Sequence, residues 1–79
     1  MNKQNNYIKI EPVLEVNTST TIRMIPEGAT ARLDRKTYGT ETSMRAICTR
    51  YNKEAGWKKY SLRSIDRGDY FDITNNAKS

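Results

Sequence analysis

The sequence lacks histidine, has a single cysteine and contains no paired cysteines or glycine-rich phosphate loop. The residues that most often act as general bases, metal ligands and nucleotide cradles are therefore missing. Cys48 has no second cysteine with which to form an intramolecular disulfide, which excludes a secreted disulfide scaffold. These absences favour a protein that binds a partner, and we expect no enzyme activity, no cofactor and no metal.

Long hydrophobic runs are also absent. No apolar stretch approaches the length of a membrane span, and the polar residues 1–6 are followed by no hydrophobic signal region. We therefore expect a cytoplasmic protein, in a bacterial cell or an infected host, with no membrane association.

What is present is enough for one small core. The chain has 79 residues, of which 35% are hydrophobic, and it includes five Tyr, one Trp and one Phe, which a disordered chain tends to lack. We predict a single domain over residues 7–74 between a disordered N-terminus, 1–6, and a disordered tail, 75–79. Because so small a core gives little net stability, we also expect a homodimer.

The first half of the chain has the composition of strands and turns. Residues 7–11 alternate apolar and polar side chains before Pro12, which predicts an edge strand or a docking arm. Residues 21–25 are rich in β-formers, residues 25–28 suit a β-turn, and alternation over residues 29–33 predicts another strand. The last two strands are expected to form a hairpin.

The clearest element is a helix that starts at Thr42 or Ser43 as cap and ends at Gly56. Its apolar positions follow helical spacing and form one stripe, which consists of Met44, Ile47, Cys48, Tyr51 and Ala55. We expect this stripe to be buried, with Cys48 as an inert thiol. The far side of the helix is basic and polar, with Arg45, Thr49, Arg50 and Lys53.

The chain after the helix predicts a second hairpin, with strands over residues 58–65 and 70–74 and a turn over residues 66–69. Half-buried strands have the alternation seen on both sides of this turn. The prediction as a whole is an α+β domain in which a small antiparallel sheet packs on one helix, in ββαββ-like order with an N-terminal edge strand or arm.

Two patterns near the second turn are explained by structure. The carboxylates of Asp66, Asp69 and Asp72 resemble a set of ligands for a hard cation, but acidic residues around a tight turn are more often a solvated hairpin end. Arg67-Gly68-Asp69 spells the tripeptide that integrins bind, yet turn formation already accounts for all three residues.

The net charge of +5 is concentrated in the middle of the chain, since residues 28–64 carry nine basic side chains and only three acidic ones. Such a cluster is typical of a phosphate-binding surface. The predicted nucleic-acid-binding residues are Arg45, Arg50, Lys53, Lys58, Lys59 and Arg63. Three aromatic residues near them are candidates for stacking on bases or for anchoring an interface: Tyr38, Trp57 and Tyr60.

The last forty residues resemble small helix-plus-hairpin orphan proteins of bacteriophages and mobile elements. The resemblance is carried by the run Ser43-Met44-Arg45-Ala46, by Arg50-Tyr51 before Gly56, and by the charged Lys59-Tyr60 strand and the turn back. It implies either a regulatory or architectural protein that binds nucleic acid, with duplex DNA favoured, or an inhibitor that binds a host defence protein. The two alternatives stay open at the level of sequence.

Overall fold

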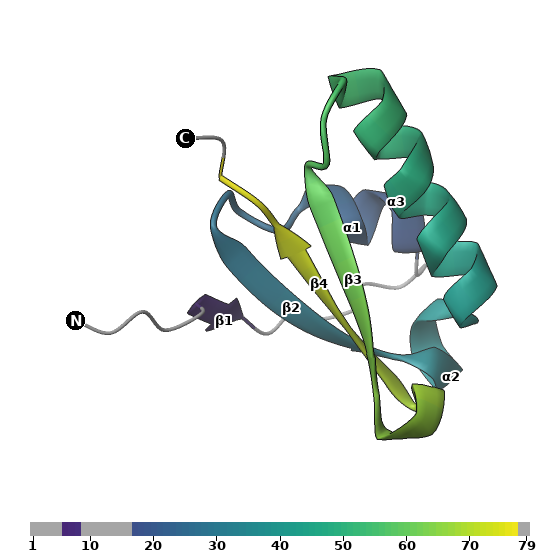
Figure 1. Cartoon of the computed structure of the whole chain (residues 1–79). Helices are drawn as coiled ribbons and strands as arrows, with labels where there is room; N and C mark the ends of the chain where they lie inside the picture. The colour runs from purple at the N-terminus through teal and green to yellow at the C-terminus, as the bar shows by residue number, and fades with distance from the viewer. Residues whose placement is uncertain (1–5, 9–16, 78–79) are drawn as a thin grey trace.

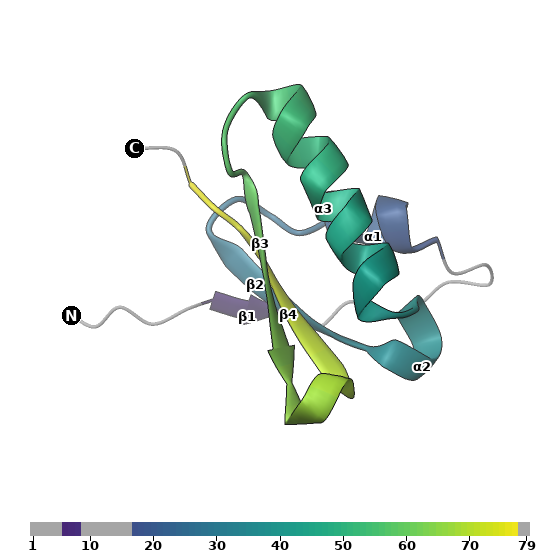
Figure 2. The same ribbon diagram turned by 45° about the vertical axis from the view of Figure 1, so that its right-hand side comes forward.

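The computed structural model describes residues 6–8 and 17–77, and in this part of the chain three α-helices lie on one face of a four-stranded sheet (Figures 1 and 2). The elements in chain order are β1 (Asn6–Ile8), α1 (Thr18–Arg23), β2 (Ala29–Asp34), α2 (Arg35–Tyr38), α3 (Glu41–Ala55), β3 (Tyr60–Ile65), a 3-10 turn (Asp66–Gly68) and β4 (Tyr70–Asn75). The strand order is β1-β2-β4-β3, with β1 parallel to β2 and the other pairs antiparallel. The predicted α+β class is confirmed.

The ββαββ-like order is wrong in its first half, because residues 21–23 of the strand predicted over residues 21–25 belong to α1 and residues 24–25 lie in the turn that follows. Asn17 caps this helix by accepting the backbone N–H of Thr20 at 3.0 Å. Ile22 and Ile25, three residues apart, are both buried on the side that faces the sheet. This packing overrides the β-propensity of the segment, as tertiary contacts often do.

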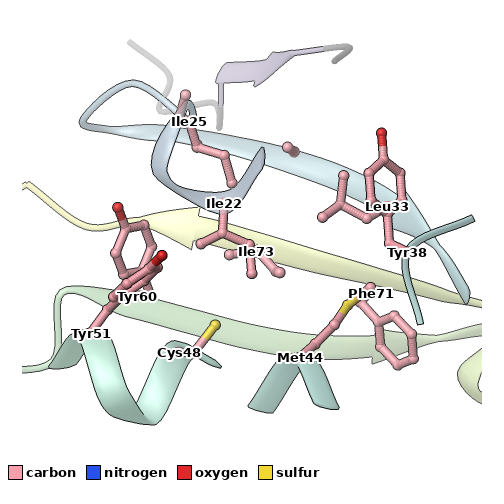
Figure 3. Packing of buried hydrophobic residues seen from close by; sticks show 12 residues of the cluster. Ile22, Ile25, Leu33, Tyr38, Met44, Cys48, Tyr51, Tyr60, Phe71 and Ile73 are labelled. Atoms are coloured by element: carbon pink, nitrogen blue, oxygen red, sulfur yellow. The ribbon is translucent and has the colours of Figure 1, made fainter. Parts of the chain in front are cut away.

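The helix predicted in the middle of the chain is confirmed as α3. Its cap is Thr40, which precedes both predicted caps, Thr42 and Ser43, and Gly56 ends the helix with a φ of 82°. Met44, Cys48 and Tyr51 point at the sheet and are buried (Figure 3). Burial raises the pKa of the Cys48 thiol to about 11, as expected of an inert cysteine.

Two members of the predicted stripe are less buried than expected. Ile47 is only partly buried at the edge of the core, and Ala55 is exposed in the last turn of α3. The buried side chains of α3 all lie in its first three turns, and in its last turn Asn52 bonds the backbone of Tyr60 in β3 through its side-chain amide.

The core lies between the helices and the sheet (Figure 3). The helices contribute Ile22 and the α3 side chains, and the strands contribute alternate residues of one face: Ala29, Ala31 and Leu33 from β2, Tyr60 from β3, and Phe71 and Ile73 from β4. The face of the sheet that points away from the helices is called the open face below.

The second hairpin, β3 and β4, is confirmed with the turn where it was predicted. The domain extends past residue 74, because Asn75 ends β4, is buried, and donates its side-chain amide to the carbonyl of Ile25 at 2.8 Å. The predicted edge strand is confirmed over β1, and its continuation over residues 9–16 lies outside the described residues. None of the described helices is long and apolar enough to cross a membrane.

Candidate nucleic-acid interface

A tight turn presents α3 to solvent. Asp34 caps α2 by accepting the backbone N–H of Thr37 at 2.9 Å. Gly39 then stops α2 with a φ of 120°, and Thr40 immediately caps α3. Only two residues therefore separate the helices, and the side of α3 opposite the core is left exposed.

The exposed side of α3 combines small and cationic side chains. Seven residues line a shallow depression there: Glu41, Thr42, Arg45, Ala46, Thr49, Arg50 and Lys53. We call this surface the α3 face. Ala46 and the two threonines are short enough for another molecule to approach the helix closely, while the three cations extend around them. The structure thus brings together Arg45, Arg50 and Lys53, as predicted.

The cations of the α3 face differ in their contacts. Arg45 forms an ion pair with Glu41 at 2.5 Å, and both side chains are about half exposed. Arg50 lies 5.5 Å from the ring centroid of Tyr51 and donates to the Ser19 hydroxyl at 3.3 Å. Lys53 forms no ion pair with any described residue. An incoming anion can therefore bind the ammonium group of Lys53, unpaired among the described residues, and the guanidinium that Arg50 holds against Tyr51. The guanidinium of Arg45 is shared with the Glu41 carboxylate.

Arg23 is a neighbouring cation that the sequence did not single out. Its guanidinium lies 5.0 Å from the ring centroid of Tyr51, the same ring that Arg50 contacts. Arg23 also lines a shallow pocket with Lys59 and Glu54 at the end of α3. Arg23 lies beside Tyr51 because it ends the helix α1. The sequence predicted a strand at this position and therefore did not place Arg23 near α3.

The other three predicted cations are dispersed. Lys58 is exposed in the loop after α3 and does not line the α3 face. Lys59 is half-buried, since its amine donates to the Asn75 side chain at 3.3 Å and lies 5.6 Å from the ring centroid of Tyr60. Arg63 lies on the open face, opposite Asp72, and the sheet separates it from α3.

Two of the three aromatic candidates are in the core. Tyr38 is 8% exposed and Tyr60 is 4% exposed, so neither ring is available to stack on a base or to anchor an interface. Tyr38 ends α2 and Tyr60 begins β3. Both rings point into the core while the basic side chains next to them in sequence point outward. Trp57 is half-buried just after Gly56 and is the remaining aromatic candidate.

The open face holds a second cluster that sequence reasoning missed. Asp72 is buried and accepts three hydrogen bonds: from Arg32 Nε at 2.8 Å, from Arg32 Nη2 at 3.1 Å and from the Tyr7 hydroxyl at 2.8 Å. The hydrogen bonds from Arg32 are the largest cause of the lowered pKa of Asp72. Tyr7 comes from β1 and reaches across β2 to β4, which no local pattern in the sequence reveals.

This cluster also changes the interpretation of Asp72, which we had placed with Asp66 and Asp69 at a solvated hairpin end. Asp72 is in the middle of β4 and is engaged by Arg32. Within residues 6–8 and 17–77, no three acidic, cysteine or histidine side chains are arranged to hold a metal ion. Arg67 has a φ of 59° in the tight turn, as the turn interpretation of Arg67-Gly68-Asp69 implies.

Comparison of the chain with protein-family models, with curated proteins and with solved structures found no match.

Proposed function

We propose that the protein binds duplex DNA through the α3 face, as a regulatory or architectural protein of a phage or mobile element. The observation that carries the proposal is the combination of Arg45, Arg50 and Lys53 around the small side chains of Ala46 and Thr49 on one exposed side of a helix. Cations supply contacts to phosphate, and small side chains allow a helix to approach base edges.

The dimensions of a helix suit this role. An α-helix with its side chains is about 10–12 Å across, close to the width of about 12 Å of the major groove of B-DNA. The methyl groups of Ala46 and Thr49 suit contact with thymine methyl groups, and an arginine at the same surface suits guanine. Arg50 and Lys53 are then positioned for phosphates on one side of the groove.

The arrangement around α3 supports the same proposal. A short helix, a two-residue turn with Gly39 and a longer exposed helix resemble a helix-turn-helix, in which the second helix enters the major groove. Because α2 has only four residues, we assign the groove contacts to α3 alone.

The salt dependence of binding tests the proposal. If Arg45, Arg50, Lys53 and Lys58 each neutralise one phosphate, the logarithm of the association constant should fall with the logarithm of salt concentration with a slope of about −3 to −4. Fluorescence anisotropy with a labelled duplex at several salt concentrations measures this slope. Absence of binding at low salt would refute the proposal.

Single substitutions at two residues of the α3 face, one in the last turn of the helix and one in the first, give opposite expected effects. Lys53→Gln should weaken duplex binding and lower the slope by about one. Glu41→Gln should strengthen binding, because it removes a negative charge from the α3 face and releases Arg45 from its ion pair. Arg67→Gln and Glu27→Gln are the matched controls, since both residues are exposed and neither lines the α3 face.

The alternative is an inhibitor that binds a host protein. Its affinity would depend on buried anchors, and the half-buried Trp57 and the exposed Met24 are the side chains suited to that role. Recovery of one protein from nuclease-treated lysate, with loss of recovery for Trp57→Ala and with no duplex binding at low salt, would favour the inhibitor.

A further inference from the structure

A shallow cup of about 300 Å³ lies on the open face, on the side of the sheet opposite the helices. Its polar lining comes from all four strands and consists of Tyr7, Thr30, Ser61, Arg63, Asp72 and Thr74. Arg63 is one of the cations predicted to bind nucleic acid, and the α3 face does not include it.

The cup carries an excess of positive charge. In the strand register, Asp72 pairs with Arg32 on one side and with Arg63 on the other. Arg32 already neutralises this carboxylate through two hydrogen bonds, and the Tyr7 hydroxyl donates a third. Arg63 forms no ion pair with any acidic residue in the described segments, although its charge contributes to the lowered pKa of Asp72. Two guanidinium groups thus lie beside one carboxylate, which leaves a net positive charge in the cup.

The hydroxyl groups in the cup have protons to donate. Thr30 and Thr74 are joined by one hydrogen bond of 2.7 Å, which uses the proton of one hydroxyl and leaves the other proton available. Ser61 accepts a hydrogen bond from the Asn76 side chain at 2.9 Å, and its own proton is not donated to a described residue. Two hydroxyl donors and the five N–H groups of Arg63 therefore face the same small space.

We infer that this cup binds a phosphate group. A guanidinium with nearby hydroxyl donors matches the several acceptor oxygens of phosphate, and such charge-assisted hydrogen bonds are about twice as strong as neutral ones. The Asp72 carboxylate does not repel the ligand strongly, because Arg32 balances its charge. The site is separate from the α3 face, so the protein has one phosphate-binding surface on each side of its sheet.

NMR titration of the whole chain with inorganic phosphate, with ionic strength held constant by sodium chloride, tests this site. The backbone amides of Ser61, Arg63 and Thr74 should shift with a saturable dependence, while those of α3 should not. Arg63→Gln should weaken phosphate binding about tenfold or more, and Ser61→Ala should weaken it a few-fold. Arg67→Gln removes the same charge from the exposed hairpin turn and should leave binding unchanged.

Two further titrations identify the source of the phosphate, one with a nucleoside monophosphate and one with a short single-stranded oligonucleotide. Whichever ligand shifts the three amides at the lowest concentration supplies the phosphate. Shifts that do not saturate, or equal losses for Arg63→Gln and Arg67→Gln, would show general screening and overturn the inference. Arg45→Gln should weaken duplex binding only, so failure at one surface is distinguishable from failure at the other.

Discussion

At the scale of single residues, Asp72 combines burial with a full set of hydrogen bonds. Its side chain is 5% exposed, and its carboxylate accepts hydrogen bonds from Arg32 on β2 and from Tyr7 on β1. A buried charge is tolerated only when partners of this kind compensate it. Asp72, which the sequence placed at a solvated hairpin end, is therefore a structural centre of the open face.

The lowered pKa of Asp72 predicts a dependence of stability on pH. The stability that its ionised form contributes is present above about pH 4, the value in an unfolded chain, and is lost as pH falls through the lower pKa of the folded state. Below about pH 4, the free energy of unfolding of the native protein should fall more steeply than that of Asp72→Asn. Denaturant unfolding at several pH values measures both. Asp69→Asn, at an exposed carboxylate, should follow the native curve, and parallel curves for Asp72→Asn would contradict the prediction.

Met44 and Ile47 allow a graded test of the core. Met44 is completely buried and Ile47 is only partly so, although the helical pattern in the sequence gave both the same role. Met44→Ala should lower the free energy of unfolding by about 3 kcal/mol, and Ile47→Ala by about 1 kcal/mol, because the latter site can admit solvent. Urea unfolding followed by circular dichroism gives both values. Equal losses would mean that Ile47 belongs to the core after all.

At the scale of elements, α3 was predictable because its own sequence specifies it. The 3.6-residue spacing of Met44, Cys48 and Tyr51 and the glycine at its end are local properties. The same holds for the hairpin of β3 and β4, whose turn residues tolerate tight conformations. The helix α1 was not predictable in this way, because threonine and isoleucine favour strands and only the burial of Ile22 and Ile25 decides against one.

Substitutions of Gly56 measure the free energy that a left-handed backbone conformation at the end of α3 costs a residue other than glycine. Its φ is 82°, and a Cβ atom there would meet no atom within 4 Å, so substitution brings conformational strain without a clash. Gly56→Ala should lower the free energy of unfolding by about 1 kcal/mol. Gly56→Asn should recover part of this loss, since asparagine tolerates the conformation better. Thermal unfolding of the three proteins compares them, and an alanine variant as stable as the native protein would contradict the prediction.

At the scale of the whole molecule, the basic middle of the chain is divided between two faces. The sequence predicted six cations as one surface, and the fold places Arg45, Arg50 and Lys53 on the α3 face but Arg63 on the open face. Alternation along β3 and the sheet order decide this division, and both depend on pairing between segments distant in the chain. The charge distribution along the sequence thus identified these cations, and the tertiary structure places them on opposite faces of the molecule.

The edge of the sheet at β3 is where the expected homodimer can be tested. Among the described residues β3 pairs only with β4, and the 2.7 Å hydrogen bond from Asn76 N to Lys59 O sets which of its backbone groups face β4. Counting along the register, the backbone groups of Leu62 and Ser64 point to the free edge. A second copy of the chain can pair with this edge, since unpaired edges are templates for strand addition.

Ser64→Pro should therefore reduce self-association without breaking the hairpin, because proline removes an N–H that β4 does not use. Light scattering should give a mass that rises toward that of a dimer between micromolar and millimolar concentration for the native protein, and a mass closer to that of the monomer for the variant. Circular dichroism checks that Ser64→Pro keeps the native fold, and Ser64→Ala, which retains the N–H, should associate like the native protein. A native protein that stays monomeric over this range would show that β3 is an edge the molecule leaves unpaired.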